Sequence, residues 1–418
     1  MTQTASVSSI NSERAGSTRA DKAIAFYKTA ATLVLLAIAF PLNVTLVLLA
    51  LGWGLVSWPF RQQRSASGGS KTVMISGGKM TKALQIARSM NAAGHRVILV
   101  ETHKYWLSGH RFSNAVDRFF TVPAPQEDGT EYARALAEIA EREGVDIYIP
   151  VCSPVASYFD SLAKPELSQW CEVFHFDADT TRMLDDKYDF AEAARKIGLS
   201  VPKSFKITDP NQVLNFDFSN ESHPYILKSI PYDSVRRLDL TKLPCETPEA
   251  TADFVHQLPI SSEKPWIMQE FIQGKELCTH STIRDGEIRL HCCSDSSAFQ
   301  VNYEHRDRPQ ILNWVTHFAE AYQFTGQFSL DFIEAEDGTP YAIECNPRTH
   351  SAITMFYNHS GVANAFIGAE KQIRPLEPLP TSKPTYWIYH EVWRLITSKS
   401  IGQFFERLAI IGNGTDAI

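Results

Sequence analysis

Two short segments near the end of the chain carry two carboxylates and an amide with the spacing of a divalent-metal site. Strand alternation along residues 327–332 places Asp331 on one face, and alternation along residues 341–346 places Glu344 and Asn346 on one face. An Asp-Gly turn lies between the segments, so they can pair as a hairpin that brings the three oxygen ligands together. Such hard ligands suit Mg²⁺, especially when nucleotide phosphates complete its octahedron. The side chains expected on the opposite face of the second segment are Tyr341, Ile343 and Cys345.

The residues that follow this hairpin add a phosphate-binding group. Pro347 ends the second strand and Arg348 comes next, with a planar guanidinium that can donate two hydrogen bonds to a phosphate. A solvated outer face would alternate polar and apolar residues in the same way. The run Glu-x-Asn-Pro-Arg after an apolar strand is much less common than a generic acidic face, which favours a functional site.

An upstream segment has the character of an adenine-binding strand. Residues 266–272 are apolar except for Gln269 and Glu270, and Glu276 follows after a Gln-Gly-Lys linker. An adenine ring needs an apolar slot with backbone donors and acceptors at its edge, and ribose hydroxyls need a carboxylate. A strand that ends in a linker and then Glu276 supplies both.

Two lysines fit phosphate binding once they are combined with these segments. Lys228 lies in the middle of the apolar run Tyr-Ile-Leu-Lys-Ser-Ile, where a charge is costly unless it is paired. Lys187 lies in a predicted helix over residues 180–197, and on its own it would be interpreted as a solvated charge.

These segments need a scaffold, and the preceding chain predicts one. Residues 72–76 and 95–101 have the pattern of buried strands and residues 80–93 that of a helix, a βαβ opening that implies a parallel sheet. Residues 131–151 repeat helix and strand. Ligands bind at the carboxyl ends of such strands, although a Gly-Gly turn alone is weak support for a contact. The residues at those ends are Gly77, Gly78, Lys79 and Ser153.

In their order along the chain, these segments resemble the ATP-grasp superfamily. The resemblance covers roughly residues 72–356 and implies ATP and Mg²⁺ as cofactors, with Mn²⁺ as an alternative ion. The residues that it makes catalytic are Lys228 and Arg348. The residues that it assigns to the nucleotide are Lys187, Lys228, Glu270, Phe271, Ile272 and Glu276. The residues that it assigns to the metal are Asp331, Glu344 and Asn346.

One departure from the family lies after Lys228. The family has a glycine-rich lid over the phosphates there, whereas residues 229–237 contain no glycine. Arg236 and Arg237 are available to cover the phosphates instead.

Within the superfamily, residues 150–158, 277–282 and 344–354 resemble the ATP-grasp ligases of mycosporine biosynthesis. The resemblance implies joining of glycine to 4-deoxygadusol, giving mycosporine-glycine. The enolised 1,3-dicarbonyl of 4-deoxygadusol is a vinylogous acid, so its oxygen can be phosphorylated and then displaced by an amine. A general carboxylate–amine ligase and a non-catalytic nucleotide-binding membrane adaptor remain as alternatives. Polar residues near the catalytic strands that can contact the organic substrates, or serve structure alone, are His280, Ser281, Arg289, Thr349, His350 and Ser351.

The fold class expected is mixed α/β and α+β: an ATP-grasp fold with a Rossmann-like pre-ATP-grasp domain and an N-terminal apolar, membrane-associating segment. The chain has 418 residues, enough for several units. The predicted divisions are a polar tail at 1–28, the apolar segment at 29–60, a linker at 61–71, the pre-ATP-grasp domain at 72–179, the ATP-grasp N-terminal part with its lid at 180–265, the catalytic C-terminal lobe at 266–380 and a C-terminal extension at 381–418.

The apolar segment holds 32 residues without a charge, from Thr29 to Phe60. An unbroken helix of that length is about 48 Å long, beyond a hydrocarbon core of roughly 30 Å. Pro41 and Asn43 mark a kink in a single span or the turn of a hairpin, and basic residues on both flanks favour the hairpin. A cleaved signal peptide normally has an apolar region shorter than this segment, which argues against that interpretation. A hairpin buried in the protein core is a further alternative.

Charge and cysteine usage indicate the compartment. The chain carries a net charge of -7, of which residues 1–71 contribute +5, so the remaining body carries -12. That acidic body argues against nucleic-acid binding, and the basic, apolar N-terminus suits an anionic cytoplasmic leaflet. The seven cysteines form no C-x-x-C pair, which favours free thiols in a reducing compartment. We therefore expect a cytosolic body at the cytoplasmic face of a membrane, with the oligomeric state open and a homodimer among the options.

Overall fold

The computed structural model describes residues 19–57, 69–151, 154–230, 236, 239–296, 302–368, 373–398 and 400–417. The chain divides into two compact units, Met1–Gln63 and Arg64–Ile418. Their boundary falls inside the polar linker that the sequence predicts at residues 61–71.

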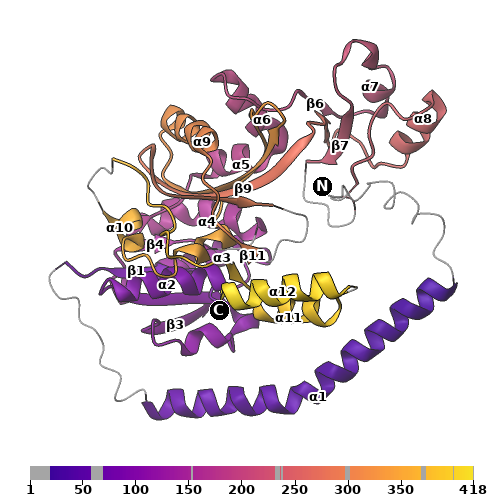
Figure 1. Ribbon diagram of the computed structural model, residues 1–418. Helices are drawn as coiled ribbons and strands as arrows, with labels where there is room; N and C mark the ends of the chain where they lie inside the picture. The colour runs from indigo at the N-terminus through magenta and orange to yellow at the C-terminus, as the bar shows by residue number, and fades with distance from the viewer. Residues whose placement is uncertain are drawn as a thin grey trace. The chain divides into compact units, whose positions relative to one another are not determined.

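In its described part, the first unit is one long helix, α1 (Arg19–Ser57), which runs through Pro41 without ending. The hairpin interpretation of the apolar segment is therefore wrong for residues 29–57. Pro41 lacks a backbone donor, and the helix bends in its middle instead of reversing (Figure 1). The hydroxyl of Thr45 donates to the Pro41 carbonyl at 2.8 Å, across one helical turn.

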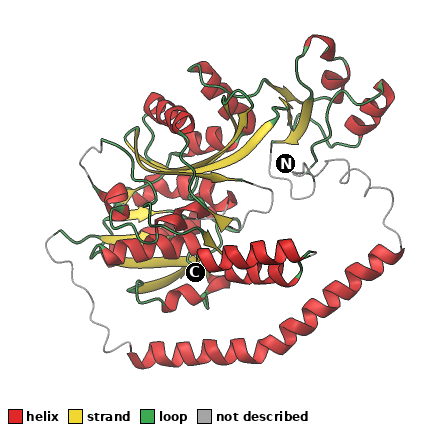
Figure 2. Ribbon diagram, in the orientation of Figure 1, coloured by secondary structure: helices red, strands yellow, loops and turns green. Residues whose placement is uncertain are grey.

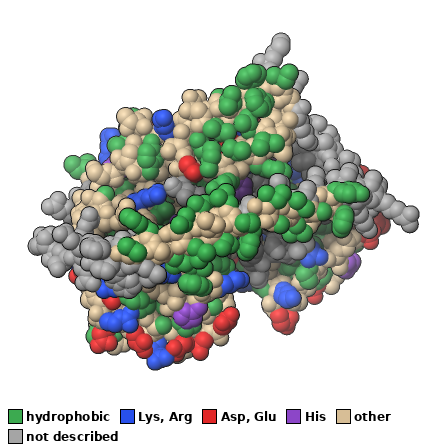
Figure 3. Space-filling model, turned by 90° about the horizontal axis from the view of Figure 1, so that it is seen from below, with side chains coloured by type: hydrophobic (Ala, Val, Ile, Leu, Met, Phe, Trp, Pro, Cys, Tyr) green, Lys and Arg blue, Asp and Glu red, His purple; other side chains and the backbone are tan. Residues whose placement is uncertain are grey.

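Helix α1 is apolar and exposed over most of its length. Its stretch Leu36–Gly54 has 19 residues and a mean hydropathy of 2.0, and none of it is buried. Within the described residues this is the one helix whose length and composition would allow it to cross a membrane. Exposed hydrophobic side chains form a broad band in the space-filling view (Figure 3).

The second unit opens with a five-stranded sheet in the order β3-β2-β1-β4-β5, in which all neighbours are parallel, as the sequence predicts. Helix α2 packs on one face, where Val73 and Ile75 contact Ile86, and helices α3 and α4 cover the other. The strands are β1 (Thr72–Ile75), β2 (Arg96–Thr102), β3 (Arg118–Val122), β4 (Ile147–Ile149) and β5 (Glu172–Val173). The helices are α2 (Thr81–Ala92), α3 (Gly129–Glu143) and α4 (Pro154–Leu167), with 3-10 turns η4 (His103–Tyr105) and η5 (Gly109–Phe112).

A small antiparallel sheet in the order β6-β8-β7 follows. One of its faces packs Tyr225 and Met268 into a core of its own. The domain division expected at residue 266 falls at the start of β8, which pairs with β6 and β7 in this small sheet. The elements are β6 (Ser204–Ile207), α7 (Pro210–Leu214), η6 (Phe218–Asn220), β7 (Tyr225–Ser229), α8 (Pro248–His256) and β8 (Trp266–Glu270).

A four-stranded antiparallel sheet, in the order β10-β9-β12-β13, forms the centre of the molecule's second half (Figure 2). On one face, Phe328 and Leu330 pack against Phe318 of α9, and α5 and α6 share this core. On the other face, Cys292 packs with Met355 in a core that also includes α2. The elements are α5 (Ala178–Asp185), α6 (Lys187–Lys196), β9 (Gly274–Arg284), β10 (Glu287–Asp295), α9 (Pro309–Tyr322), β12 (Gly326–Ala335), β13 (Pro340–Asn346), η7 (Ser351–Phe356) and α10 (Val362–Ile367).

The predicted single helix over residues 180–197 is two helices. Asp186 has extended backbone angles, ends α5 and caps α6 by accepting hydrogen bonds from the backbone N–H groups of Tyr188 and Asp189. A side chain that caps the backbone in this way competes with helix continuation. The break leaves Lys187 in the first turn of α6.

The chain ends with a small three-stranded sheet and two helices. Glu391 on α11 is fully buried and accepts hydrogen bonds from Arg394 at 3.0 Å and Arg407 at 3.5 Å, which ties α11 to α12. The elements are β11 (Asn302–Tyr303), β14 (Thr385–Tyr386), α11 (Ile388–Ile396), α12 (Ile401–Asn413) and β15 (Thr415–Asp416). The cysteines in the described residues are free thiols, as the sequence predicts.

Candidate active site

The hairpin of β12 and β13 brings the three predicted metal ligands to one surface. Asp331 pairs directly with Glu344 across the strands, and Asn346 pairs with Ser329. Directly opposite residues share a face of a sheet, so both carboxylates and the amide project from the same side. The predicted grouping is confirmed, and the role of these groups as metal ligands stays a prediction.

A β-bulge at Ile343 changes the alternation that the sequence suggests. Asp331 pairs with Glu344, so regular pairing would place Phe332 opposite Ile343. Phe332 instead pairs with Ala342, which makes Ile343 the extra residue on β13. Ala342 and Cys345 therefore face the hydrophobic core together. The expectation that Tyr341, Ile343 and Cys345 share that face is wrong. The bulge re-aims the strand immediately beside Glu344.

The two opposed carboxylates repel one another when both are ionised. Burial raises the pKa of Asp331 to about 7, and the carboxylates of Glu344 and Glu276 act in the same direction. The positive charges of Arg348 and Lys228 oppose the shift. A cation placed between Asp331 and Glu344 would relieve this repulsion, and oxygen donors of this kind suit Mg²⁺. Within the described residues no group of three or more His, Cys, Asp and Glu could hold a metal, so Asn346 and phosphate oxygens would complete the set.

Both predicted lysines reach this cluster. The ammonium of Lys187 lies 3.3 Å from Glu344 Oε1, and its side chain is mostly buried. Lys228 projects from β7 and donates to Gln269 Oε1 at 3.1 Å. Burial lowers the pKa of Lys228, while the carboxylates of Glu344, Asp331 and Glu276 oppose that shift. The sequence interpretation of Lys187 as a solvated charge is therefore excluded.

Arg348 completes the positive side of the site. Burial lowers the pKa of its guanidinium, and the carboxylates of Asp185, Glu344 and Asp331 counteract that effect. Burial raises the pKa of Asp185, and the positive charges of Arg348 and Lys187 oppose that rise. Asp185 was not predicted; its only signal was an acidic pair before Lys187. The site thus alternates buried cations with carboxylates, an arrangement that can neutralise a transferring phosphoryl group.

The nucleotide end of the site differs in one respect from the expectation. Glu270 pairs with Tyr225 and so lies on the opposite face of the small sheet from Lys228. Its carboxylate bonds to His223 Nδ1 at 2.8 Å and accepts from the Lys203 N–H at 3.1 Å. The Glu270 carboxylate thus bonds to residues beside the linker, and its assignment to the nucleotide stays a prediction.

The face that does point toward the carboxylates carries Ile226, Ile267 and Gln269 beside Lys228. Ile226 and Ile267 are buried and supply the apolar surface that an adenine ring requires. The N–H of Phe271 is already bonded to the Pro224 carbonyl at 2.7 Å. Phe271 and Ile272 extend the strand into the linker.

Glu276 stands at the edge of the cluster. It pairs with Ile333 across β9 and β12. Its Oε1 accepts from the Ser296 hydroxyl at 3.0 Å. The side chain is exposed, so its carboxylate is accessible to a ribose.

The parallel-sheet domain also touches the site, but not through all the predicted residues. Lys82 at the start of α2 donates to the Thr349 carbonyl, and Ser157 on α4 donates to the Pro347 carbonyl at 2.7 Å. Lys79 instead lies with its ammonium 3.4 Å from the centre of the Tyr105 ring. The Gly78 carbonyl accepts bonds from the side chains after β2. Ser153, Arg237 and most of the lid lie outside the described residues, and Arg236 donates to the Gln257 carbonyl at 3.3 Å.

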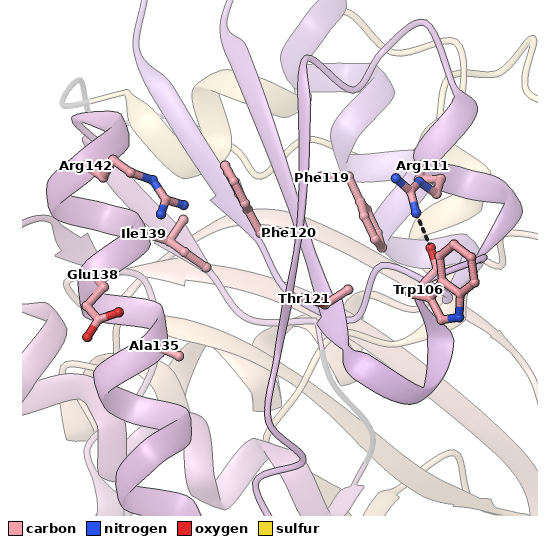
Figure 4. Close-up of a pocket in the computed structure, with 9 residues that line it drawn as sticks. All are labelled: Trp106, Arg111, Phe119, Phe120, Thr121, Ala135, Glu138, Ile139 and Arg142. Carbon is pink, nitrogen blue, oxygen red and sulfur yellow. Dashed lines mark hydrogen bonds between the residues drawn. The ribbon is translucent and has the colours of Figure 1, made fainter. Parts of the chain in front are cut away.

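Surface pockets occur elsewhere on the unit. One of about 450 Å³ lies between β3 and α3, lined by aromatic rings and two arginines, and Arg111 donates to the Trp106 carbonyl at 2.5 Å there (Figure 4). A second pocket of about 420 Å³ is lined in part by Tyr303. The Tyr303 ring meets the His350 ring edge-to-face, with 5.3 Å between the ring centres. Neither contains a residue of the carboxylate cluster.

Comparison with known proteins supports the fold at low sequence identity. No family model matches the chain. Over 228 residues it is 21% identical to the carbamoyl phosphate synthase large chain, C-terminal section, of Methanopyrus kandleri; this covers 50% of the chain and 41% of that relative. The chain therefore matches less than half the length of that relative.

Solved structures match more of the chain. L-amino acid ligase from Bacillus licheniformis is similar with a TM-score of 0.50 and 16% identity, covering 71% of this chain and 69% of that one. N5-carboxyaminoimidazole synthetase from Staphylococcus aureus, complexed with ADP, has a TM-score of 0.55, 14% identity and coverages of 75% and 80%. Biotin carboxylase with β,γ-ATP from Campylobacter jejuni has a TM-score of 0.56 and 14% identity, and the match covers 73% of this chain and 72% of that one. The chain has the fold of the ATP-grasp ligases, as the sequence predicts.

Proposed function

We propose that the chain is an ATP- and Mg²⁺-dependent ligase that forms a carbon–nitrogen bond, joining glycine to 4-deoxygadusol. The observation that carries the ligase proposal is the directly opposed pair Asp331 and Glu344, surrounded by Lys187, Lys228 and Arg348. The solved neighbours support it, because ATP-grasp ligases share this fold and several were crystallised with ADP or ATP. The choice of substrates rests on the sequence resemblance of three segments around the site.

The residues present fit a magnesium–nucleotide complex. Asp331, Glu344 and Asn346 would hold the metal, which when bound would neutralise phosphate charge. Lys228 and Arg348 are buried on the same side and would hold the transferred phosphoryl group in line with the enol oxygen. Low solvent access strengthens these interactions. No covalent nucleophile from the protein is needed.

The chemistry then proceeds on the substrates. The enol oxygen of 4-deoxygadusol takes the γ-phosphoryl group of ATP, which leaves ADP and a phosphate ester. The glycine nitrogen adds to the carbon that bears the ester, the C–O bond breaks, and phosphate leaves. Loss of the nitrogen proton gives the enaminone of mycosporine-glycine.

The decisive assay supplies purified full-length protein with ATP, Mg²⁺, 4-deoxygadusol and glycine. We expect release of phosphate together with an ultraviolet chromophore at longer wavelength than that of 4-deoxygadusol. Each substrate omitted in turn serves as the control. Turnover on a pair of ordinary amino acids, with none on 4-deoxygadusol, would replace this proposal with the general amino-acid ligase, which the similarity to L-amino acid ligase favours as second candidate.

We also propose that α1 attaches the enzyme to the cytoplasmic face of a membrane. The apolar, exposed stretch Leu36–Gly54 supports this. A second apolar surface on α11 and α12 exposes Trp393, Ile396 and Phe405, and helices that lie on membrane surfaces carry such apolar and aromatic side chains on one face. Full-length protein should sediment with membranes and require detergent for extraction, whereas a chain starting at residue 64 should lose much of this association. Extraction of the full chain by alkaline carbonate alone would contradict insertion.

A further inference from the structure

One face of the four-stranded sheet carries polar atoms that the protein itself leaves without hydrogen-bond partners. Within the described residues, such atoms are His280 Nε2 and Thr282 Oγ1 on β9, Gln327 Oε1 and Ser329 Oγ on β12, and Thr349 Oγ1 just after β13. Each of these residues is at most 2% exposed. Buried polar atoms in folded proteins are nearly always bonded, so five together indicate that something else supplies their partners.

The strand register places these residues in one continuous patch, which we call the polar face. Thr282 pairs with Gln327 across β9 and β12, and Ser329 pairs with Asn346 across β12 and β13. Ser329 is also two residues from Asp331 and so shares its side of the strand. The polar face therefore begins at the metal-binding cluster and extends away from it along β12, on the side of the sheet where Cys292, the partner of His280 on β10, packs with Met355.

The other side of the same strands has a different character. Ser281, between His280 and Thr282, bonds to His291 Nδ1 at 3.0 Å. Phe328 and Leu330, on either side of Ser329, pack in the hydrophobic core. Along residues 279–282 and 327–330, the polar side-chain atoms without partners lie on the side that carries the carboxylates, whereas Thr279 and Ser281 on the other side are hydrogen-bonded.

The donors and acceptors of the polar face define the chemistry of its ligand. The backbone N–H of His350 donates to His280 Nδ1 at 3.3 Å, and burial lowers the pKa of His280 well below its ordinary value. His280 is therefore neutral, with its proton on Nε2, which is a donor. Gln327 Oε1 is an acceptor, and the hydroxyls of Thr282, Ser329 and Thr349 serve as either. The set has no formal charge, so it suits the uncharged part of a ligand, a part that carries several hydroxyl or carbonyl groups.

The dimensions of the polar face also limit the ligand. Two residues along a strand span roughly 7 Å, and neighbouring strands lie about 4.8 Å apart. The patch from Thr282 and Gln327 to Ser329 therefore has about the footprint of one substituted six-membered ring. The carboxylate or ammonium of a free amino acid would lack a counter-charge among these five groups.

We propose that the polar face binds the ring of the phosphate-accepting substrate, a compact polyhydroxylated cyclohexenone, with its reacting oxygen at the Ser329 end beside Asp331 and Arg348. The assignment rests on the proposed function and deepens it by naming the residues that recognise this substrate. Glycine then approaches from outside the patch. His280, Thr282, Gln327 and Ser329 act as specificity-determining residues and take no part in proton transfer.

Two variants and one matched control test the proposal. Thr282→Val and Ser329→Ala each remove one hydroxyl of the polar face. Ser281→Ala removes a hydroxyl from the same strand on its other side. We expect the first two to raise the KM for 4-deoxygadusol about tenfold, the effect of one lost hydrogen bond to a ligand, with the KM values for ATP and glycine changed less than about twofold. Ser281→Ala should leave all three KM values unchanged.

Thermal unfolding of the free protein provides a second readout. Because the hydroxyls of Thr282 and Ser329 have no protein partner, their removal should leave Tm unchanged or raise it. Ser281→Ala loses its bond to His291 and should lower Tm. A lower Tm for Thr282→Val and Ser329→Ala, with no change in any KM, would mean that these hydroxyls are structural and would overturn the proposal.

Binding of 4-deoxygadusol, measured by calorimetry with a non-hydrolysable ATP analogue and Mg²⁺, separates this proposal from the proposed function. Binding that is weakened in the two variants, without turnover in the wild type, refutes the ligase assignment and supports the polar face. Turnover with variants that behave like Ser281→Ala supports the ligase and refutes the polar face. Absence of both binding and turnover overturns both, and the patch then holds ordered water only.

Discussion

The opposed carboxylates should make the free protein unusually sensitive to pH, and Asp331→Asn exposes that sensitivity. In the folded state burial and Glu344 raise the pKa of Asp331 to about 7, against an ordinary value of 3.8. Between these two values the folded state binds more protons than the unfolded state. Ionisation of Asp331 therefore costs stability, and that cost grows as the pH rises from about 4 to about 7.

The magnitude follows from the same two pKa values. The cost is about 2 kcal/mol at pH 5 and about 4 kcal/mol at pH 8. Asparagine has nearly the same shape and cannot ionise. Asp331→Asn should therefore stabilise the nucleotide-free protein, and the gain should be about 2 kcal/mol larger at pH 8 than at pH 5. The difference between the two pH values cancels any pH-independent effect of the substitution.

Urea unfolding of the full chain in the presence of a chelator measures this difference. Asp337→Asn, in the turn of the same hairpin, is the matched control. Hydrogen bonds from Thr339 hold the pKa of Asp337 below its ordinary value, so it stays ionised from pH 5 to pH 8 and its replacement should show no pH-dependent gain. A gain for Asp331→Asn that is equal at both pH values, or larger at pH 5, would refute the reasoning.

Other predictions concern the charges around this pair. Lys187→Ala should weaken Mg-ATP binding about tenfold by calorimetry, because it removes the cation beside Glu344. Arg348→Ala should lower kcat at least about 100-fold in a steady-state assay, because it removes a cation that would stabilise the transferring phosphoryl group. Asp185 only balances the charge of Arg348, so Asp185→Asn should lower kcat less than about tenfold in the same assay. Glu391→Gln should lower the unfolding free energy by about 3 kcal/mol in urea titration, because two arginines lose a fully buried partner, while the KM for ATP stays unchanged.

Much of the site could be predicted because it depends on local periodicity. A strand has a period of two residues and an Asp-Gly turn closes a hairpin, so Asp331, Glu344 and Asn346 could be placed on one surface from their spacing alone. Lys228 could be identified because a charged side chain in an apolar strand is unfavourable unless it is paired. The parallel sheet was also predictable, since alternating helix and strand patterns with buried strands have few other solutions.

The bulge at Ile343 and the break at Asp186 show where local periodicity is insufficient. A bulge depends on the partner strand and not on the residue that bulges, and residues 341–346 alternate well enough without one. Asp186 is compatible with a helix interior, and the need to pack α5 and α6 separately against β13 decides that it caps instead. Neither the bulge nor the helix break could be predicted without the neighbouring elements of the fold.

Burial and charge pairing needed the tertiary structure most. The sequence by itself determined the fold class, the hairpin that carries the carboxylates and the identities of the cationic groups. Only the assembled fold showed that Glu270 faces away from Lys228, that Asp185 lies beside Arg348, and that five buried polar atoms around Ser329 lack a hydrogen-bond partner. Periodicity reports which side of an element a residue occupies. The dielectric environment and the partner of a side chain depend on segments that are distant in the sequence, such as those of Ser157 and Pro347, which are 190 residues apart.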